Sequence, residues 1–239
     1  MADERVKRVL CTADPGGADD MLARVLEAAA EHDVQAVALI GELSGDTNTR
    51  EGSRAILKTL GQCRLPAFWV PGARDAPVGD SLREAYNLEV VYPSLHGVHG
   101  TAAFAPGYVL FAGFGGHVDD DPDGRREELS ELSYPRWEPE YRLKLLREFK
   151  DHELVLLFAT PPLHKDPGAG SSEVLAELVG THRPRLVVCG GERGTWKIGR
   201  SLVVAPGSVE DGCFAVADLS ARDAELHELA VAPVDGSAA

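Results

Sequence analysis

The chain has 239 residues, enough for one large α/β domain or two small ones, and its 44% hydrophobic and 26% charged residues are typical of globular proteins. The net charge of −14 repels phosphate backbones and anionic lipids, so we expect neither a nucleic-acid partner nor a membrane partner. Because the chain has no long apolar run and its four cysteines are isolated, we expect a cytoplasmic protein with reduced thiols.

The first third of the chain alternates apolar runs with amphipathic segments. The apolar runs predict strands over 6–13, 34–40 and 67–70. Apolar residues at helical spacing predict helices over 19–31 and 48–60. Strands that alternate with helices in this way favour a parallel sheet covered on both faces.

The middle of the chain has short apolar runs with little room for helices between them. They predict the hairpins of a second sheet, with strands over 88–92, 100–104 and 108–112. A helix is predicted over 138–150, with Tyr141, Leu145 and Phe149 on one face.

The last third returns to alternating strands and helices. It predicts a helix over 171–180 and strands over 153–158, 185–189, 201–204, 213–218 and 225–229. No linker-like stretch divides the chain, so we expect one domain over 1–233 followed by a flexible tail over 234–239.

Glycine- or proline-containing loops follow the predicted strands in a recognisable order. They read Ala13-Asp14-Pro15-Gly16-Gly17, Gly41-Glu42, Val70-Pro71-Gly72-Ala73-Arg74-Asp75, Ala159-Thr160-Pro161-Pro162, Gly190-Gly191-Glu192-Arg193 and Ala205-Pro206-Gly207-Ser208-Val209. This order resembles the S-D-x-H-G, G-D, G-N-H-D/E, H-x-P-P, G-H-x-H and N-P-G-S-V motifs of the calcineurin-like metallophosphoesterases, in particular a bacterial subgroup with degenerate motifs. The resemblance covers roughly residues 6–229. It implies an α/β fold, a four-layer α/β/β/α sandwich of two mixed β-sheets flanked by helices, with two metal ions at the carboxyl ends of the strands.

The resemblance also implies which residues stand at the ligand positions. Asp14 matches the first-motif aspartate, and Glu42 takes the place of the bridging aspartate. Arg74 takes the place of the catalytic histidine, and Arg193 that of a histidine in the fifth motif. The remaining ligand positions hold residues without a coordinating side chain: Gly16, Ala73, Ala159 and Gly191.

Two carboxylates cannot supply the ligands of a dinuclear centre, and a guanidinium group is repelled by a nearby dication. Arginine instead suits a phosphate group, so Arg74 and Arg193 are candidate phosphate ligands. His164 and Lys165, just past the fourth motif, are further candidates. We therefore expect a weakly active or non-hydrolytic binder of a phosphorylated small molecule without a resident cofactor. The catalytic residues and the oligomeric state stay open.

Two alternatives also stay open. One is an active metal-dependent phosphodiesterase or phosphomonoesterase that holds Mn, Fe, Zn or Ca. Its ligands would be Asp14, Glu42, His164 and Glu192. The other is a protein-interaction module on the same scaffold, with Tyr134 and Trp137 in an exposed apolar patch.

Three further features favour structural roles. Asp119, Asp121 and Asp123 resemble the opening of a calcium loop, but Ser130 stands where the closing glutamate belongs, so we expect a solvated acidic loop. We expect His117 to be a structural histidine, and Asp75 to bind the backbone of its own loop.

Overall fold

The computed structural model describes residues 5–45, 50–121, 123–164 and 170–230. Their core is two six-stranded sheets. The first sheet contains β1 (Arg8–Ala13), β2 (Ala36–Ile40), β3 (Ala67–Val70), β4 (Leu95–Gly97), β13 (Cys213–Asp218) and β14 (Asp223–Glu228), in the order β14-β13-β1-β2-β3-β4. Because β1 to β4 are parallel and β13 and β14 are antiparallel to their neighbours, this sheet is mixed.

The second sheet is mixed in the same way. It contains β5 (Ala102–Ala105), β6 (Val109–Phe114), β9 (Leu154–Phe158), β10 (Leu186–Cys189), β11 (Gly194–Ile198) and β12 (Ser201–Ala205), in the order β11-β12-β10-β9-β6-β5. Only the two edge strands, β5 and β11, run antiparallel to their neighbours. Two short strands, β7 (His117–Asp119) and β8 (Ser133–Pro135), pair separately.

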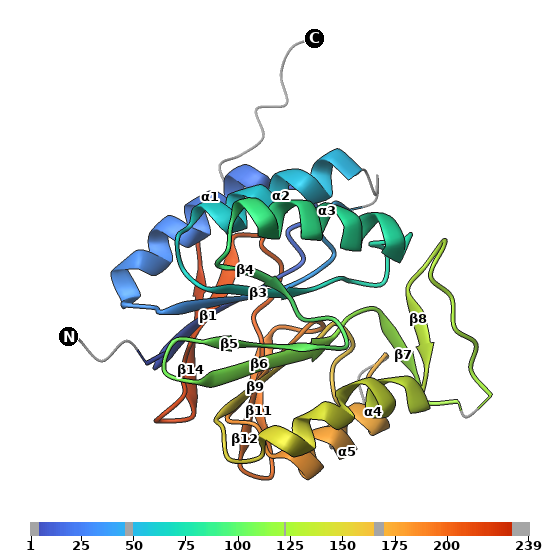
Figure 1. Cartoon of the computed structure of the whole chain (residues 1–239). Helices are drawn as coiled ribbons and strands as arrows, with labels where there is room; N and C mark the ends of the chain where they lie inside the picture. Colours follow the sequence, from blue (N-terminus) through green and yellow to red (C-terminus); the bar gives the residue numbers. More distant parts are fainter. Residues whose placement is uncertain (1–4, 46–49, 122, 165–169, 231–239) are drawn as a thin grey trace.

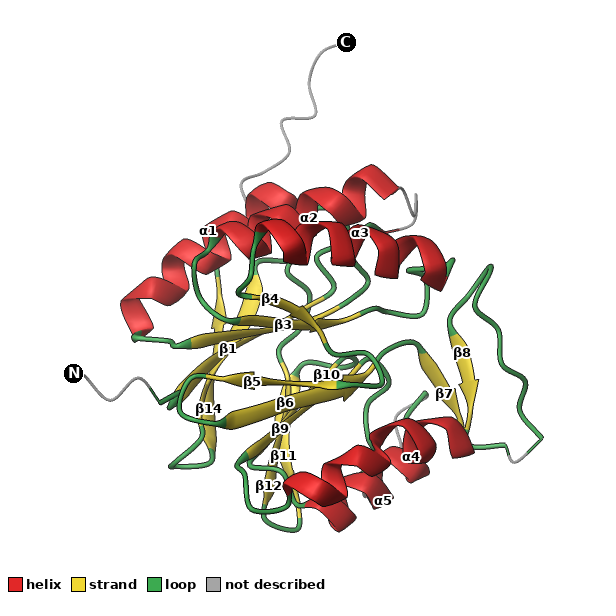
Figure 2. Ribbon diagram, in the orientation of Figure 1, coloured by secondary structure: helices red, strands yellow, loops and turns green. Residues whose placement is uncertain are grey.

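Helices cover the outer face of each sheet. The first sheet is covered by α1 (Asp19–Ala29), the 3-10 helix η1 (Ala30–His32), α2 (Arg50–Gln62) and α3 (Val78–Val91). The second is covered by α4 (Trp137–Leu143), the 3-10 helix η3 (Lys144–Phe149) and α5 (Glu173–His182). Figures 1 and 2 show the resulting helix–sheet–sheet–helix order, which confirms the predicted four-layer sandwich.

The inner core lies between the two sheets and draws on both. Phe68 of β3 and Phe111 of β6 stack across it with ring centroids 3.9 Å apart. Val9 and Cys11 of β1 and Leu157 of β9 belong to the same buried cluster. Because each central strand is covered on both faces, its sequence is continuously apolar, which is why the central strands were predictable.

Two predicted elements are wrong. Residues 88–92 are not a strand, because Val78–Val91 is helix α3. Leu88 is buried between the helices and the outer face of the first sheet, whereas Val90 is exposed. The β-branched run was misleading because tertiary packing overrides local propensity. The segment 138–150 is also not one helix: it changes to the 3-10 helix η3 after α4, and Tyr141 is 60% exposed.

The predicted single domain over 1–233 stays a prediction, and the predicted tail over 234–239 lies outside the described residues. In the described part of the chain, no helix combines the length and the apolar character that a membrane span requires.

Candidate functional site

The loops that follow β1, β2, β3, β9 and β10 meet in a cleft of about 290 Å³. They converge because the carboxyl ends of parallel strands share one edge of each sheet, and the two sheets are stacked. The lining includes Asp14, Glu42, Arg74, His117, Ala159 and Gly191. Five of the six motifs therefore contribute at least one residue to this cleft.

Asp14 is held in place by backbone contacts on both sides. Its backbone N–H donates to the Ile40 carbonyl oxygen (2.9 Å), and its Oδ1 accepts from the backbone N–H of Glu42 (2.9 Å). The Ser208 hydroxyl, from the sixth motif, donates to its carbonyl oxygen (2.9 Å). Its φ of +47° is a left-handed conformation that non-glycine residues rarely adopt. These contacts fix the Asp14 carboxyl group just beyond the carboxyl end of β1.

Asp75 binds the backbone of its own loop, as predicted, and also that of the loop after β2. It is buried, and its carboxylate accepts hydrogen bonds from the backbone N–H of Leu43 (2.9 Å) and of Gly72 (2.8 Å). Burial raises the pKa of Asp75 to about 6, and the backbone hydrogen bonds oppose that rise. Asp75 thus ties the loop after β2 to the loop after β3.

Glu42 and Arg74 form a pair inside the cleft. Glu42 Oε2 accepts from the backbone N–H of Arg74 (2.7 Å) and lies 3.8 Å from Arg74 Nε. Burial raises the pKa of Glu42 to about 7; nearby Asp75 adds to the rise, and Arg74 opposes it. The pKa of Asp14 is also raised, mainly by burial. The Arg74 side chain is 55% exposed, so its guanidinium group stays accessible to a ligand.

The space beside Gly16 is taken by a carboxyl group that sequence reasoning missed. A Cβ atom on Gly16 would lie 2.0 Å from Glu210 Oε1. Glu210 also raises the pKa of Asp14 through its negative charge. The only sequence signal was an acid directly after Ala205-Pro206-Gly207-Ser208-Val209, and no spacing rule connects it to Gly16.

His117 lines the cleft, although its predicted role was structural. It is half-buried at the start of β7, next to Thr160 of the fourth motif. The Thr160 hydroxyl donates to the Gly116 carbonyl oxygen (3.1 Å) and accepts from the Val118 N–H (2.9 Å). Thr160 therefore fixes the fourth motif against the strand that carries His117.

His164, Glu192 and Arg193 line a second pocket of about 360 Å³, which shares Pro161 and Gly191 with the cleft. The structure therefore does not bring His164 and Glu192 together with Asp14 and Glu42. Arg193 contacts β14 instead: its Nη1 lies 3.1 Å from Glu228 Oε2, and its Nη2 donates to the His227 carbonyl oxygen (2.9 Å). Lys165 lies outside the described residues.

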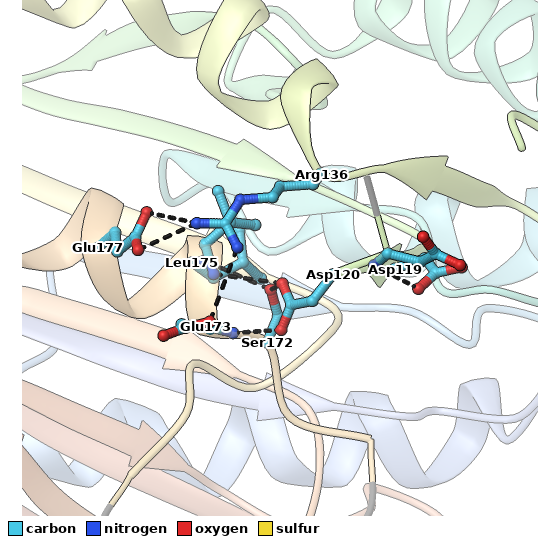
Figure 3. Close-up of polar contacts among 9 residues, drawn as sticks. Asp119, Asp120, Arg136, Ser172, Glu173, Leu175 and Glu177 are labelled. Atoms are coloured by element: carbon cyan, nitrogen blue, oxygen red, sulfur yellow. Dashed lines mark hydrogen bonds and ion pairs between the residues drawn. The ribbon is translucent and has the colours of Figure 1, made fainter. Parts of the chain in front are cut away.

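The acidic loop is bound to the protein and does not simply face solvent as expected. Asp120 accepts hydrogen bonds from the Ser172 hydroxyl (2.8 Å) and from the backbone N–H of Glu173 (2.5 Å) and Val174 (3.2 Å) at the start of α5 (Figure 3). Ser172 in turn pairs by its backbone with Pro161 of the fourth motif and with Leu163 just after it. The loop thus helps to position one wall of the site.

The carboxylates at the calcium-like positions are used by the local backbone. Asp119 Oδ1 accepts from the Asp121 N–H (2.9 Å), and Asp121 Oδ1 accepts from the Asp123 N–H (2.9 Å). These contacts are those of successive Asx turns.

Residues 48–229 match the family model for the metallophosphoesterases of the calcineurin superfamily. The chain belongs to this family. Its members usually bind divalent metal ions. The curated proteins include no match to the chain.

Solved structures agree with this assignment. The chain is 38% identical to TT1561 of Thermus thermophilus, with a TM-score of 0.88, covering 94% of this chain and 99% of that one. A second crystal structure is 26% identical with a TM-score of 0.85, covering 95% and 100% of the two chains. A novel archaeal phosphodiesterase is 12% identical with a TM-score of 0.53, covering 93% and 99%, and shares the fold alone.

Proposed function

We propose that this metallophosphoesterase-family chain binds a phosphorylated small molecule in the cleft at the carboxyl ends of its strands and hydrolyses it weakly or not at all. The observation that carries the proposal is the Arg74–Glu42 pair, with Arg74 Nε 3.8 Å from Glu42 Oε2, in a cleft where Ala73, Ala159 and Gly191 stand at ligand positions.

The donor set of the cleft does not fit a dinuclear metal centre. Such a centre needs several carboxylate and imidazole ligands around two ions about 3.5–4 Å apart. The cleft lining contains one imidazole, His117, and the carboxylates of Asp14 and Glu42. Among the described residues, one group of at least three histidine, cysteine or acidic side chains has its ligand atoms within 4.8 Å of one another. That group lies outside the cleft.

The remaining groups suit an anion better. Arg74 offers an exposed guanidinium group, the side chain that matches the geometry of phosphate oxygens. Because the pKa of Glu42 is raised to about 7, its negative charge is reduced near neutral pH, so it repels a phosphate less than an ordinary carboxylate does. The adjoining pocket, with His164 and Trp196, offers rings for the organic part of the ligand.

The alternatives receive less support from the geometry. An active phosphoesterase would need His164 and Glu192 to reach Asp14, but they line the neighbouring pocket. For an interaction module, Tyr134 is fully buried and donates its hydroxyl to Glu128 Oε1 (3.0 Å), while Trp137 alone of the pair is exposed.

Calorimetric titration of the purified protein with inorganic phosphate and with phenyl phosphate tests the binding. Arg74→Ala should weaken binding at least about tenfold, which is roughly 1.4 kcal/mol. Arg185→Ala is the matched control, because Arg185 pairs with Glu153 (3.3 Å) at the amino ends of β10 and β9, away from the cleft, and should leave affinity unchanged. Equal affinities of wild type and Arg74→Ala would contradict the proposed role of Arg74.

Hydrolysis of bis(p-nitrophenyl) phosphate with added manganese tests the absence of catalysis. Because the proposal includes weak hydrolysis, we expect at most slow turnover, and none that depends on Asp14. Turnover that disappears in Asp14→Ala would overturn the proposal and support the active enzyme instead.

A further inference from the structure

A cluster of ligand-type side chains lies at the β14 edge of the first sheet, apart from the cleft. His32 ends the 3-10 helix η1 that follows α1. Glu225 and His227 lie on β14, and residues two apart on a strand face the same side. None of the three lines the cleft.

The three side chains converge on one point. One ligand atom from each of His32, Glu225 and His227 lies within 4.8 Å of the others. The imidazole rings of His32 and His227 have centroids 4.5 Å apart. His227 Nε2 is 3.7 Å from Glu225 Oε2.

The His227 ring is held in a fixed orientation, but one of its nitrogen atoms lacks a hydrogen-bond partner among the described residues. Phe214 of β13 stacks on it with centroids 4.9 Å apart and an angle of 17°, which fixes the ring plane. Its Nε2 is buried and has no hydrogen-bond partner in the structure. A buried polar atom without a partner is costly, so this nitrogen is a natural ligand atom.

The two nearby arginines are each paired with an acid. Arg8 Nη1 donates to the His32 carbonyl oxygen (3.0 Å), and its Nε lies 4.0 Å from Asp218 Oδ2. Arg193 is paired with Glu228 in the same way, at 3.1 Å. Both arginines contact main-chain oxygens and acids, so neither takes the place of a cation between the imidazoles.

We propose that His32, Glu225 and His227 bind one zinc-class transition-metal ion. Two imidazoles and a carboxylate are a typical ligand set for Zn²⁺, which binds histidine nitrogen at about 2.0–2.1 Å and leaves a fourth position for water. Drawing the ligand atoms onto one ion requires the Glu225 side chain to shift, and it is 79% exposed and able to do so. The ion joins an edge strand to the turn after α1, across nearly the whole length of the chain.

Titration of the metal-stripped full-length protein with zinc, followed by calorimetry, tests this site. We expect one zinc ion per chain, lost in His32→Ala and in His227→Ala. Glu225→Gln keeps the shape of the side chain and should bind at least about tenfold more weakly, since even outer-shell partners of a metal contribute about 10–100-fold. His182→Ala, which removes a half-buried histidine from the end of α5, is the matched control and should bind as wild type does.

Two further measurements separate this site from the cleft and from misfolding. Asp14→Ala should keep the zinc binding, because Asp14 belongs to the cleft. Zinc at about 100 times its Kd should raise the Tm of wild type by about 5 °C and leave that of His32→Ala unchanged. Absence of stoichiometric binding, or binding that survives both histidine substitutions, would overturn the proposal.

Discussion

At the scale of single residues, three acids lie close together in the cleft and in the loop beside it. Asp14, Glu42 and Asp75 all have a raised pKa, and burial is the largest cause for each. The carboxylate oxygens of Asp75 accept hydrogen bonds from backbone N–H groups. Glu42 accepts a hydrogen bond from the backbone N–H of Arg74. Arg74 and the main chain therefore oppose the rise in pKa that burial causes in these acids.

Glu42 should make the protein less stable as the pH rises. Its pKa is about 7 in the folded protein against an ordinary value of 4.5, so its stabilising contribution is present below about 4.5 and is lost as the pH rises through 7. We expect Glu42→Gln to gain about 2 kcal/mol relative to wild type between pH 5 and pH 8. Urea unfolding at both pH values, with a chelator present, measures the difference.

The control for this prediction is Glu31→Gln, which changes an exposed acid of η1. Its stability curve should run parallel to that of wild type. If Glu42→Gln also runs parallel, then Glu42 does not titrate as its burial implies.

At the scale of elements, one long-range contact fixes the wall of the site. Figure 3 shows the Asp120 carboxylate at the start of α5. It also shows the Arg136 side chain in contact with both Glu173 and Glu177, which belong to α5. Asp120 thus satisfies N–H groups that have no partner within the helix. Ser172, just before α5, also forms a β-bridge with Pro162. The start of α5, which Asp120 caps, is therefore bonded directly to the fourth motif.

Asp120→Ala should destabilise the protein by about 1 kcal/mol, the usual result of losing an N-terminal cap. Chemical denaturation of the variant measures this. Asp119→Ala is the comparison, because Asp119 accepts one N–H in an exposed turn and its loss should change the unfolding free energy by less than about 0.5 kcal/mol. Equal effects of the two substitutions would show that the cap contributes no more than a loop turn.

The sequence predicted the elements that carry strong local signals and missed those that depend on distant contacts. The buried strands β2, β3, β9 and β13 were found because covering both faces makes a strand apolar throughout. The strand β11 was missed, because its half-exposed edge sequence lacks that signature.

The same reasoning explains which site residues were found. Asp14, Glu42 and Arg74 follow strands directly, so the order of motifs placed them in one cleft. Glu210 was missed because it meets Gly16 through folding and not through spacing. Arg193 was expected in the cleft, but its pairing with Glu228 on β14 could not be read from either segment alone.

At the scale of the whole molecule, the fold is the part of the family likeness that the solved structures show. A TM-score of 0.88 against a relative with 38% identity shows that the two-sheet scaffold is closely shared. That scaffold brings the strand ends of both sheets to one cleft whether or not the loops carry metal ligands (Figure 1). The shared scaffold therefore determines where the cleft lies, and the side chains of this chain determine the chemistry of the cleft.

Diffraction from crystals soaked in manganese and phosphate tests the central claim most directly, because the anomalous signal locates each manganese ion and the electron density locates each phosphate group. We predict no manganese at Glu42 and a phosphate group within hydrogen-bond distance of Arg74. Two ordered manganese ions that share the Glu42 carboxylate would contradict the account.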